Sequence, residues 1–344
     1  MKIKAAILVQ QKKPLVLDEI EFKDVLTFGQ VLVRLKHSGI CGSQIGEIYG
    51  AKGEDKYLPH LLGHEGLGVV LDIGPGVTKV KQNDQVVLHW RKSSGLESTP
   101  PKYYLGNKII NAGWITTFNN YAIISENRLT PIKNQHNSKV LSLFGCAITT
   151  GFGAIENNAK TKIGQSVFIF GAGGVGLNMI QAANILNCYP IIACDLFNNR
   201  LELAKKVGAT HIFNTKKINL KELEKKLPLS NYDVFIDNTG NPDIISFGYK
   251  IIKQQGKLIL VGVPNIDHDI KIHSLPLHFG KEIIGSHGGN TIPHDDIPRL
   301  SNLLKNKNIN FNEIITEEYS LDNINTAIQR MMNGNMAGRC IINF

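Results

Sequence analysis

The sequence Gly-Ala-Gly-Gly-Val-Gly at residues 171–176 decides the fold of the second half of the chain. It follows a short apolar run, Val167 to Phe170, and opens a segment of helical periodicity that continues to Leu186. A strand, a glycine-rich turn and a helix in this order are typical of a dinucleotide-binding loop. The alternative interpretation is a glycine-rich turn between core elements, without a ligand.

Each residue of this loop has a physical role in that interpretation. Gly171 would permit the tight turn, Gly173 would let the backbone approach a pyrophosphate, and Gly176 would let the helix pack closely on the strand. The first helical residues, Gly174 and Val175, offer free N–H groups and the positive end of the helix dipole to phosphates. We therefore predict that these five residues bind the cofactor.

The end of the second strand should select the cofactor. Asp195 lies some 20 residues beyond the loop, where a carboxylate accepts from the ribose 2′-OH and repels a 2′-phosphate, so NAD is predicted over NADP. Arg200 leaves alternatives open, because it would pair with Asp195, contact the ribose or tolerate a 2′-phosphate. Gly262 and Val263, just after a later strand, complete the predicted cofactor site.

The elements around the loop predict a parallel, doubly wound α/β sheet, because strands and helices alternate from about residue 150 to 285. The predicted strands are 166–170, 190–194, 233–236, 257–261 and 282–284, and the helices are 174–186 and 200–207. Before this region, short β-branched runs at 5–9, 31–35, 68–73, 85–89 and 120–125 predict a barrel or half-barrel. Helices at 297–304 and 321–332 and a strand at 339–342 are predicted in the tail.

Composition and charge narrow the classes of protein. Hydrophobic residues make up 42% and charged residues 19% of the chain, which is typical of a globular protein rather than a disordered one. The net charge of +9 fits a nucleic-acid binder or a lysine-rich solvated surface. We favour the solvated surface, because no dense Lys/Arg block appears and residues 221–226 alternate acid and base. A positive site for an anionic substrate stays open.

Cysteine usage and hydropathy predict a cytoplasmic protein. The five cysteines are odd in number and widely spaced, so we expect reduced thiols rather than a disulfide scaffold. The N-terminal apolar run is too short for a signal peptide. Residues 140–155 come closest to a membrane span, but Ser, Thr and Gly interrupt them. We expect neither a membrane nor a nucleic acid as a partner.

Three short motifs in the first half carry metal-ligating side chains. They are Cys41 in Gly-Ile-Cys-Gly-Ser, His64 in Gly-His-Glu-Gly and Cys146 in Phe-Gly-Cys. Each motif is unremarkable alone, because an isolated buried cysteine usually packs in a core and an isolated histidine is usually a satisfied polar group.

Together these motifs resemble the zinc-dependent alcohol dehydrogenases of the medium-chain dehydrogenase/reductase superfamily. The block at 63–77, the segment 146–153 that leads to the glycine loop, and Thr-Phe-Asn-Asn-Tyr at 117–121 carry the resemblance. It covers nearly the whole chain and is closest to the liver and glutathione-dependent-formaldehyde branch. The resemblance implies a GroES-like catalytic domain at 1–147, an NAD-binding Rossmann domain at 148–286, and a return to the catalytic domain at 287–344.

The resemblance also assigns roles to residues. Cys41, His64 and Cys146 match the ligands of one catalytic Zn2+ per chain, which leave the fourth tetrahedral position open. Glu65 matches a carboxylate close to the metal, and Ser43 matches the hydroxyl that passes on the proton of the alcohol. The implied reaction is hydride transfer between NAD and an alcohol–carbonyl pair, with zinc as the Lewis acid.

The sequence departs from the family pattern in three places. Residues 91–115 lack the four closely spaced cysteines of a structural zinc, so this second zinc should be absent. Gly46 replaces the histidine that ends the proton relay in the liver branch, so ribose, water or another group must take over. Gln44 replaces an aspartate that often supports the zinc-bound histidine, and its amide oxygen would accept from His64 instead.

The segment His89-Trp90-Arg91 matches the substrate pocket of the family and predicts a polar secondary alcohol that is sugar- or polyol-like. Trp90 would stack on a sugar ring, and Arg91 would bind a phosphate or carboxylate. His37 would add a donor. The alternative is that His89 and Arg91 face solvent while Trp90 fills the core, because neighbouring residues on a strand face opposite ways.

Two other functions stay open at this point. A zinc-free NAD(P)H reductase of the same fold would lack the Cys and His–Glu ligands, which this chain retains. A dinucleotide-binding regulatory protein with a lapsed active site is kept open by Gln44 and Gly46. By resemblance, the chain should form a homodimer or homotetramer through the sheet edge near residues 257–272.

Overall fold

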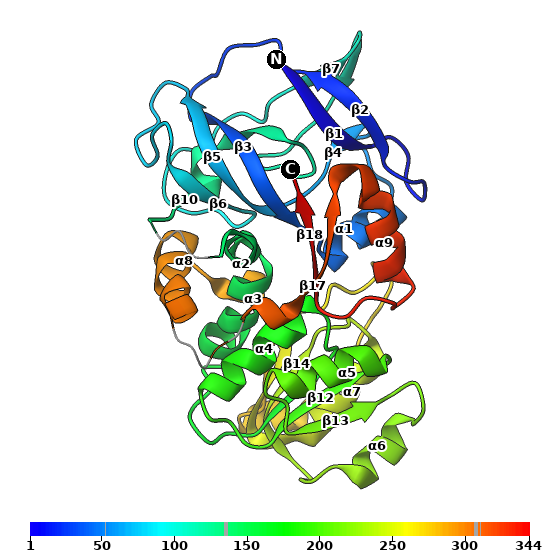
Figure 1. Ribbon diagram of the computed structural model, residues 1–344. Helices are drawn as coiled ribbons and strands as arrows, with labels where there is room; N and C mark the ends of the chain where they lie inside the picture. Colours follow the sequence, from blue (N-terminus) through cyan, green and yellow to red (C-terminus); the bar gives the residue numbers. More distant parts are fainter. Residues whose placement is uncertain (52, 134–136, 306–308, 310) are drawn as a thin grey trace. The chain divides into compact units, whose positions relative to one another are not determined.

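The computed structural model describes residues 1–344 except 52, 134–136, 306–308 and 310 (Figure 1). Within these residues the chain forms two compact units. The first comprises Met1–Cys146, Ile292–Asn335 and Arg339–Phe344, and the second comprises Ala147–Thr291 and Met336–Gly338. Both ends of the chain therefore belong to the first unit.

The second unit is a parallel, doubly wound α/β sheet, as the sequence predicts. Its strands follow the order β13-β12-β11-β14-β15-β16, and each neighbouring pair is parallel. The strands are β11 (Val167–Phe170), β12 (Ile191–Asp195), β13 (His211–Asn214), β14 (Tyr232–Asp237), β15 (Ile252–Leu260) and β16 (Glu282–Gly285). The helices are α3 (Ala147–Gly153), α4 (Gly174–Ile185), α5 (Asn198–Lys206), α6 (Leu220–Lys226) and α7 (Pro242–Ile251). The order reverses between β11 and β14, which is the point where such sheets bind dinucleotides.

The core of this unit explains why its central strands form. All four residues of β11 are buried, as expected for a parallel strand that is covered on both faces. The Phe168 ring stacks on Phe235 of β14 with the centroids 4.8 Å apart, and meets Tyr232 edge-on at 5.2 Å. This aromatic packing fixes β11, and the glycine-rich loop starts where β11 ends.

The first unit is mostly β, also as predicted. One sheet has the order β4-β1-β2-β7-β8 and another has β10-β6-β5-β3-β18-β17, with β9 pairing β3. The strands of the first half are β1 (Lys2–Leu8), β2 (Val16–Glu21), β3 (Gln30–Gly39), β4 (His60–Leu61), β5 (Glu65–Ile73), β6 (Gln85–His89), β7 (Tyr103–Leu105), β8 (Lys108–Ile110), β9 (Tyr121–Ser125) and β10 (Leu129–Pro131). The C-terminal strand β18 (Arg339–Asn343) pairs antiparallel with β3 and parallel with β17 (Ile315–Ser320). The last residues of the chain therefore lie beside the segment that leads to Cys41.

The helices of the first unit differ in part from the sequence prediction. They are α1 (Gly42–Tyr49), α2 (Ser138–Ser142), α8 (Pro293–Ser301) and α9 (Ile324–Met332). Helix α8 begins four residues before the predicted start at 297, because Pro293 fits the first helical turn and the Asp296 carboxylate accepts the N–H of Ile292 at 2.7 Å. Helix α1 was not predicted, and it follows directly on Cys41.

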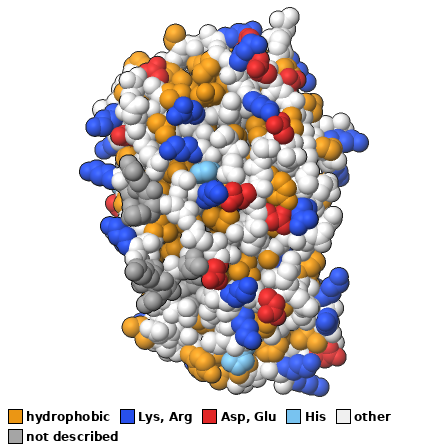
Figure 2. Space-filling view, in the orientation of Figure 1, with side chains coloured by type: hydrophobic (Ala, Val, Ile, Leu, Met, Phe, Trp, Pro, Cys, Tyr) orange, Lys and Arg blue, Asp and Glu red, His pale blue; other side chains and the backbone are white. Residues whose placement is uncertain are grey.

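The surface and the helix lengths bear on possible partners. On the face shown in Figure 2, Lys and Arg side chains are interspersed with acidic ones rather than gathered into one patch. Within the described residues, no single helix has the length and hydropathy to cross a membrane, and only Ser138–Gly145 together with Ala147–Asn158 meets these criteria as a bent pair.

Candidate functional site

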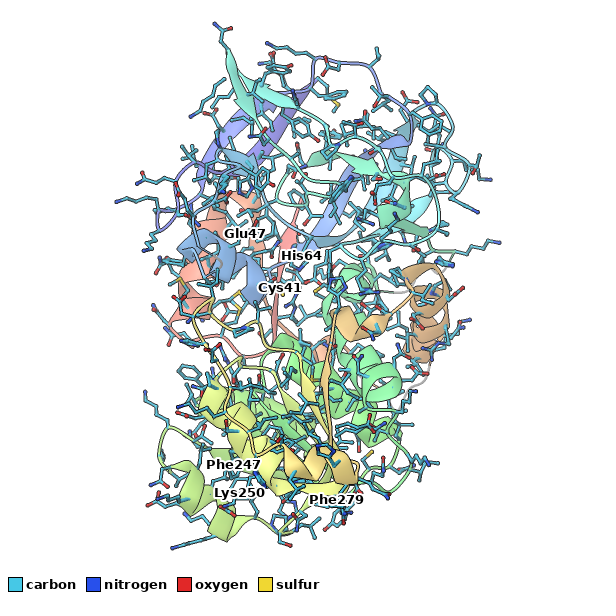
Figure 3. All side chains as sticks on the ribbon, turned by 180° about the vertical axis from the view of Figure 1, so that it is seen from behind. Cys41, Glu47, His64, Phe247, Lys250 and Phe279 are labelled. Atoms are coloured by element: carbon cyan, nitrogen blue, oxygen red, sulfur yellow. The ribbon has the colours of Figure 1, made fainter. Side chains whose placement is uncertain are left out.

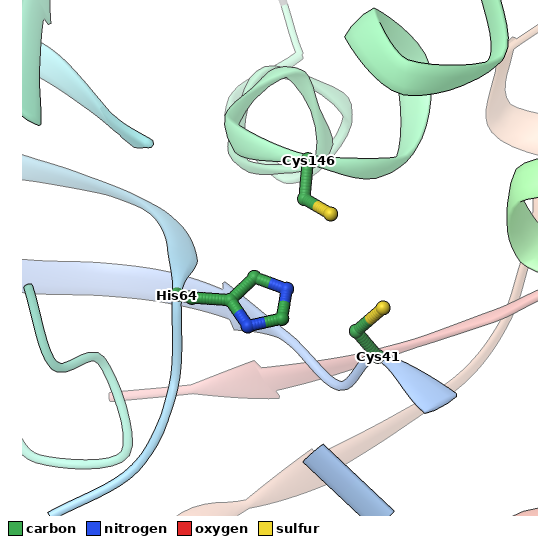
Figure 4. Close-up of side chains that lie close together, drawn as sticks. All are labelled: Cys41, His64 and Cys146. Atoms are coloured by element: carbon green, nitrogen blue, oxygen red, sulfur yellow. The ribbon is translucent and has the colours of Figure 1, made fainter. Parts of the chain in front are cut away.

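Two thiols and an imidazole converge in the first unit. The side chains of Cys41, His64 and Cys146 each offer one ligand atom, and these atoms lie within 4.8 Å of one another. Both cysteines are buried, and His64 is partly buried. Figure 4 shows the two thiol groups and the imidazole ring directed into the same small space. The structure therefore brings together the three residues that the sequence predicts as ligands.

Local structure holds each of these side chains in place. Cys41 is the N-cap residue of α1, two residues after the end of β3, and Cys146 follows a short helical turn, Leu143–Gly145. His64 precedes β5 and follows Gly63, whose φ of +95° favours glycine. A Cβ atom at Gly63 would also lie 2.3 Å from Oγ1 of Thr117, so a larger residue would displace the backbone next to His64.

The electrostatics of the cluster fit a metal ion. The pKa of the Cys41 thiol lies well below its usual value, because the neighbouring Cys146 thiol and the His64 ring favour the thiolate more than burial opposes it. Among the described residues, the buried Nε2 atom of His64 has no hydrogen-bond partner. Two thiols and one imidazole are the donors that zinc prefers, and three protein ligands leave one position open. The residues present therefore fit zinc.

A buried ion pair beside the cluster was missed by the sequence analysis. Glu65 forms a salt bridge with Arg339, and the exposed fractions of the two side chains are only 0% and 3%. Arg339 begins β18, and the N–H of Ile40 donates to the carbonyl of the next residue, Cys340. The sequence gave no signal for this pair, because an arginine near the C-terminus is expected on the surface. Only the pairing of β18 with β3 shows that Arg339 is buried.

In helix α1, Gln44 does not have the expected contact and Ser43 lies on the surface. Gln44 does not direct its amide oxygen at His64; Oε1 accepts the backbone N–H of Cys41 at 2.9 Å, as the fourth residue of a capping box does. Ser43 lies in the first turn of α1, two residues from Cys41, and its side chain is exposed. Gly46 adds no side chain to this helix.

The predicted substrate segment divides into two parts. His89 is buried, and its ring nitrogens lie 2.8 Å from the carbonyl of Arg91 and 3.0 Å from Oγ1 of Thr130. Burial lowers the pKa of His89 to about 4, so the ring is neutral. These contacts hold the His89 ring against protein atoms at the end of β6.

Trp90 and Arg91 lie differently from His89. The register of β5 and β6 pairs Glu65 with His89 as the last pair of the ladder, so His64 and Trp90 are the next residues of the two segments beyond the same end of the ladder. The guanidinium of Arg91 lies over the Trp90 ring, 5.9 Å from its centroid. In contrast, His37 is held by Asn343 and Ser138 at 2.8 and 2.9 Å.

The glycine-rich loop of the second unit has the geometry that the sequence predicts. Gly171 has a φ of +99°, and a Cβ atom at Gly176 would lie 2.0 Å from the carbonyl oxygen of Gly171. A Cβ atom at Gly173 would meet nothing within 4 Å, so the backbone is open on that side. The first intrahelical bond of α4 runs from the N–H of Leu177 to Gly173, which leaves the preceding N–H groups without a helical acceptor. These groups can bind an anion.

Asp195 and Arg200 lie beside this loop. Asp195 is 6% exposed at the end of β12, and its carboxylate accepts the N–H of Ala172 at 2.9 Å and of Phe197 at 3.0 Å. Nη1 of Arg200 lies 3.8 Å from Asp195 Oδ2, and the guanidinium lies over the Phe197 ring. Of the alternatives for Arg200, the structure shows the ion pair with Asp195.

Gly262 and Val263 follow β15 at the same edge of the sheet. The N–H of Gly262 donates to the carbonyl of Asp237 at 3.0 Å, and a Cβ atom at Gly262 would lie 2.3 Å from the backbone nitrogen of Gly240. Val263 is 60% exposed. The ends of β11, β12, β14 and β15 thus bring the predicted cofactor residues to one edge.

Comparisons with known proteins identify the two halves of the chain. Residues 28–134 match the alcohol dehydrogenase GroES-like domain, and residues 174–306 match the zinc-binding dehydrogenase family. The chain is 28% identical to an alcohol dehydrogenase class-3 of Cereibacter sphaeroides, covering 97% of this chain and 98% of the relative. It is likewise 28% identical to an S-(hydroxymethyl)glutathione dehydrogenase of Paracoccus denitrificans, with the same coverage.

The solved structures agree with the sequence relatives. The crystal structure of benzyl alcohol dehydrogenase from Acinetobacter calcoaceticus is similar with a TM-score of 0.88 and 27% identity, covering 100% of this chain and 99% of that chain. An alcohol dehydrogenase zinc-binding domain protein from Burkholderia ambifaria gives the same TM-score at 25% identity and the same coverage. The chain therefore belongs to the zinc-dependent alcohol dehydrogenases of the medium-chain dehydrogenase/reductase superfamily and is an NAD-dependent oxidoreductase.

Proposed function

We propose that this enzyme oxidises a polar secondary alcohol, sugar- or polyol-like, with one zinc ion held by Cys41, His64 and Cys146. The convergence of their ligand atoms within 4.8 Å supports this assignment. When bound there, zinc supplies a Lewis acid that polarises an alcohol or carbonyl oxygen. The loop at 171–176, together with Asp195, would hold NAD at the edge of the sheet, so that the nicotinamide ring can accept the hydride.

The side chains around the metal ligands would handle charge and protons. Ser43 is exposed in the first turn of α1, so its hydroxyl can accept the proton of the alcohol and pass it to water. Because Gly46 has no side chain, water or the cofactor ribose would continue the relay. Arg339 balances the charge of the buried Glu65 and so keeps this carboxylate beside the ligands without an uncompensated charge.

Trp90 and Arg91 would select the substrate. The β5–β6 register, in which Trp90 and His64 follow the last paired residues at the same end of the ladder, is the observation that carries this proposal. From this end of the ladder, where the ligand His64 also lies, the Trp90 indole would offer a flat apolar face to a sugar ring. Arg91, over the same ring, offers a guanidinium to a phosphate or carboxylate on the substrate. His89 stays outside this proposal, because its ring contacts protein atoms.

Catalytic efficiency with NAD across a panel of alcohols tests the substrate class. The panel contains ethanol, neutral polyols, sugar phosphates and S-(hydroxymethyl)glutathione, which the name of the Paracoccus denitrificans relative suggests as an anionic alternative. We expect the highest kcat/KM with a polyol or its phosphate. Arg91→Gln should raise KM for phosphorylated substrates and leave neutral polyols unchanged. A clear preference for ethanol would refute the proposal.

Assembly and location belong to the same proposal. A homodimer or homotetramer would form through the edge strand β16 and the segment before it, because an open sheet edge pairs readily. Large apolar side chains are exposed in this segment: Val263, Ile266, Leu275, Leu277 and Phe279. Light scattering on the purified protein distinguishes a monomer from these assemblies. The five cysteines are free and buried, which supports a reducing, cytoplasmic location.

A further inference from the structure

A second cluster of metal-ligating side chains lies in the first unit, outside the thiol site. Glu47, Asp55 and His60 each offer one ligand atom, and these atoms lie within 4.8 Å of one another. Glu47 lies in the last turn of α1, Asp55 in the loop that follows, and His60 in β4. Figure 3 shows Glu47 on the helix that begins beside Cys41. The cluster thus joins three consecutive segments between two of the zinc ligands.

The imidazole of His60 is held as a metal ligand would be. The ring is buried, with an exposed fraction of 7%. Nδ1 lies 2.9 Å from the carbonyl oxygen of Leu61, and because a carbonyl only accepts, Nδ1 carries a proton. Nε2 lies 2.7 Å from Oδ2 of Asp55 and donates its proton to this carboxylate. A bound cation would take the place of that proton between the two groups. A histidine whose one nitrogen donates to a backbone carbonyl commonly presents its other nitrogen to a metal ion.

The charges of the cluster favour the binding of a cation. The pKa of Asp55 lies below its usual value: burial raises it, but the hydrogen bonds from His60 and from the N–H of Tyr57 outweigh burial. Among the described residues, the half-buried carboxylate of Glu47 has neither a hydrogen-bond nor a salt-bridge partner. Two carboxylates beside one imidazole keep a net negative charge even when the ring is protonated.

We propose that Glu47, Asp55 and His60 form a second divalent-cation site in this enzyme. Two carboxylates and one imidazole suit Mn2+ or Zn2+, and water would fill the remaining positions. Ligand bonds of about 2.0–2.2 Å place neighbouring donor atoms roughly 3 Å apart, so the cluster needs only a small contraction. This donor set has no thiolate and therefore holds its ion less tightly than the cysteine site.

The position of the site gives the ion a structural role. Cys41 directly precedes α1, which carries Glu47, and His64 lies four residues beyond His60. An ion that bridges Glu47 and His60 ties together the two segments that carry these zinc ligands. The sequence between 91 and 115 lacks the cysteines of a structural zinc. An ion bound by Glu47, Asp55 and His60 would cross-link a different part of the first unit.

Manganese binding to the full-length enzyme, loaded with one equivalent of zinc per chain so that only the thiol site is filled, tests the proposal. Free Mn2+ is followed by its EPR signal during titration, and zinc is measured in the same samples to show that the thiol site stays loaded. We expect one Mn2+ per chain. Glu47→Gln, which keeps the shape of the side chain, should weaken Mn2+ binding at least tenfold. Glu54→Gln is the matched control, because Glu54 is an exposed acid in the same loop outside the cluster.

Thermal unfolding gives a second measurement that does not depend on activity. Added Mn2+ should raise the Tm of the wild type and of Glu54→Gln but not that of Glu47→Gln, and the Tm values without Mn2+ show whether each variant folds. Failure of the wild type to bind Mn2+, or equal weakening in both variants, would show that Asp55 and His60 form only an internal ion pair. Either result overturns the second site and leaves the zinc site at the cysteines untouched.

Discussion

The zinc site and the dinucleotide loop are built in opposite ways. Cys41, His64 and Cys146 come from three separate segments that only the folded first unit brings together. The loop at 171–176 is a single run of residues whose shape follows from glycine backbone geometry and from the strand and helix on either side. A dispersed site therefore depends on tertiary packing, and a continuous one on local conformation. Changes in one region should leave the ligand of the other bound.

Replacement of Ser43 should give the largest separation between the two regions. Ser43→Ala removes the hydroxyl proposed to accept the proton of the alcohol, so kcat should fall by about 10²–10⁴-fold. NADH affinity, measured by fluorescence titration, should stay unchanged because the loop at 171–176 is intact. Ser43→Thr keeps a hydroxyl and should restore most of the turnover. Wild-type turnover in Ser43→Ala, under conditions where chemistry limits the rate, would reduce Ser43 to a structural residue.

His89 should make the first unit sensitive to acid. Its folded pKa of about 4 lies below the ordinary value of 6.5, because burial disfavours the charged ring. The contribution of the neutral ring to stability is complete above pH 6.5 and is lost as the pH falls to 4, by about 3 kcal/mol.

Urea unfolding at pH 7 and pH 4 measures this contribution. His89→Gln should lose less stability over this pH interval than the wild type, by a difference of about 3 kcal/mol. His268→Gln is the matched control, because His268 is exposed and should leave the pH dependence as it is. If both variants follow the wild-type pH dependence, His89 is not the titrating group.

Asp195 should produce the smallest effect, confined to the second unit. Asp195→Gly removes the negative charge that would repel a 2′-phosphate, and it also removes the ion-pair partner of Arg200. The preference for NAD over NADP, measured as the ratio of the two kcat/KM values, should therefore narrow by about tenfold. Asp195→Asn separates charge from hydrogen bonding, because an amide oxygen can still accept the N–H of Ala172. Steady-state kcat/KM with each cofactor measures the preference. Equal efficiency of the unmodified enzyme with both cofactors would show that Arg200 dominates over Asp195.

The elements that a single stretch of sequence forms by itself could be predicted from the sequence in some detail. Strand β6 has the predicted bounds, Gln85–His89, because its apolar run is interrupted sharply at both ends. The loop glycines have the predicted geometry, since a tight turn and close helix packing admit few other residues. The three zinc ligands were identified only through resemblance to a family, because nothing in their spacing along the chain brings them together.

Features that depend on tertiary contacts could not be predicted. Helix α1 was not predicted because the glycines at 42 and 46 lower helix propensity. Its stability comes from the capping contact of Gln44 and the burial of Ile48. The same contact made the expected role of Gln44 wrong. The pair Glu65–Arg339 joins residues that are far apart in the chain, and only the pairing of β18 with β3 makes the arginine a neighbour of the zinc site.

Cobalt substitution tests the central claim most directly, namely that Cys41, His64 and Cys146 bind one metal ion together. Co2+ bound by thiolates gives intense near-ultraviolet charge-transfer absorption, whereas Co2+ bound by oxygen and nitrogen alone does not. We predict this absorption at one equivalent of Co2+ per chain, reduced by about half in Cys146→Ser as one of two thiolates is lost. An absorption that is absent from the wild type, or unchanged in Cys146→Ser, would contradict the account.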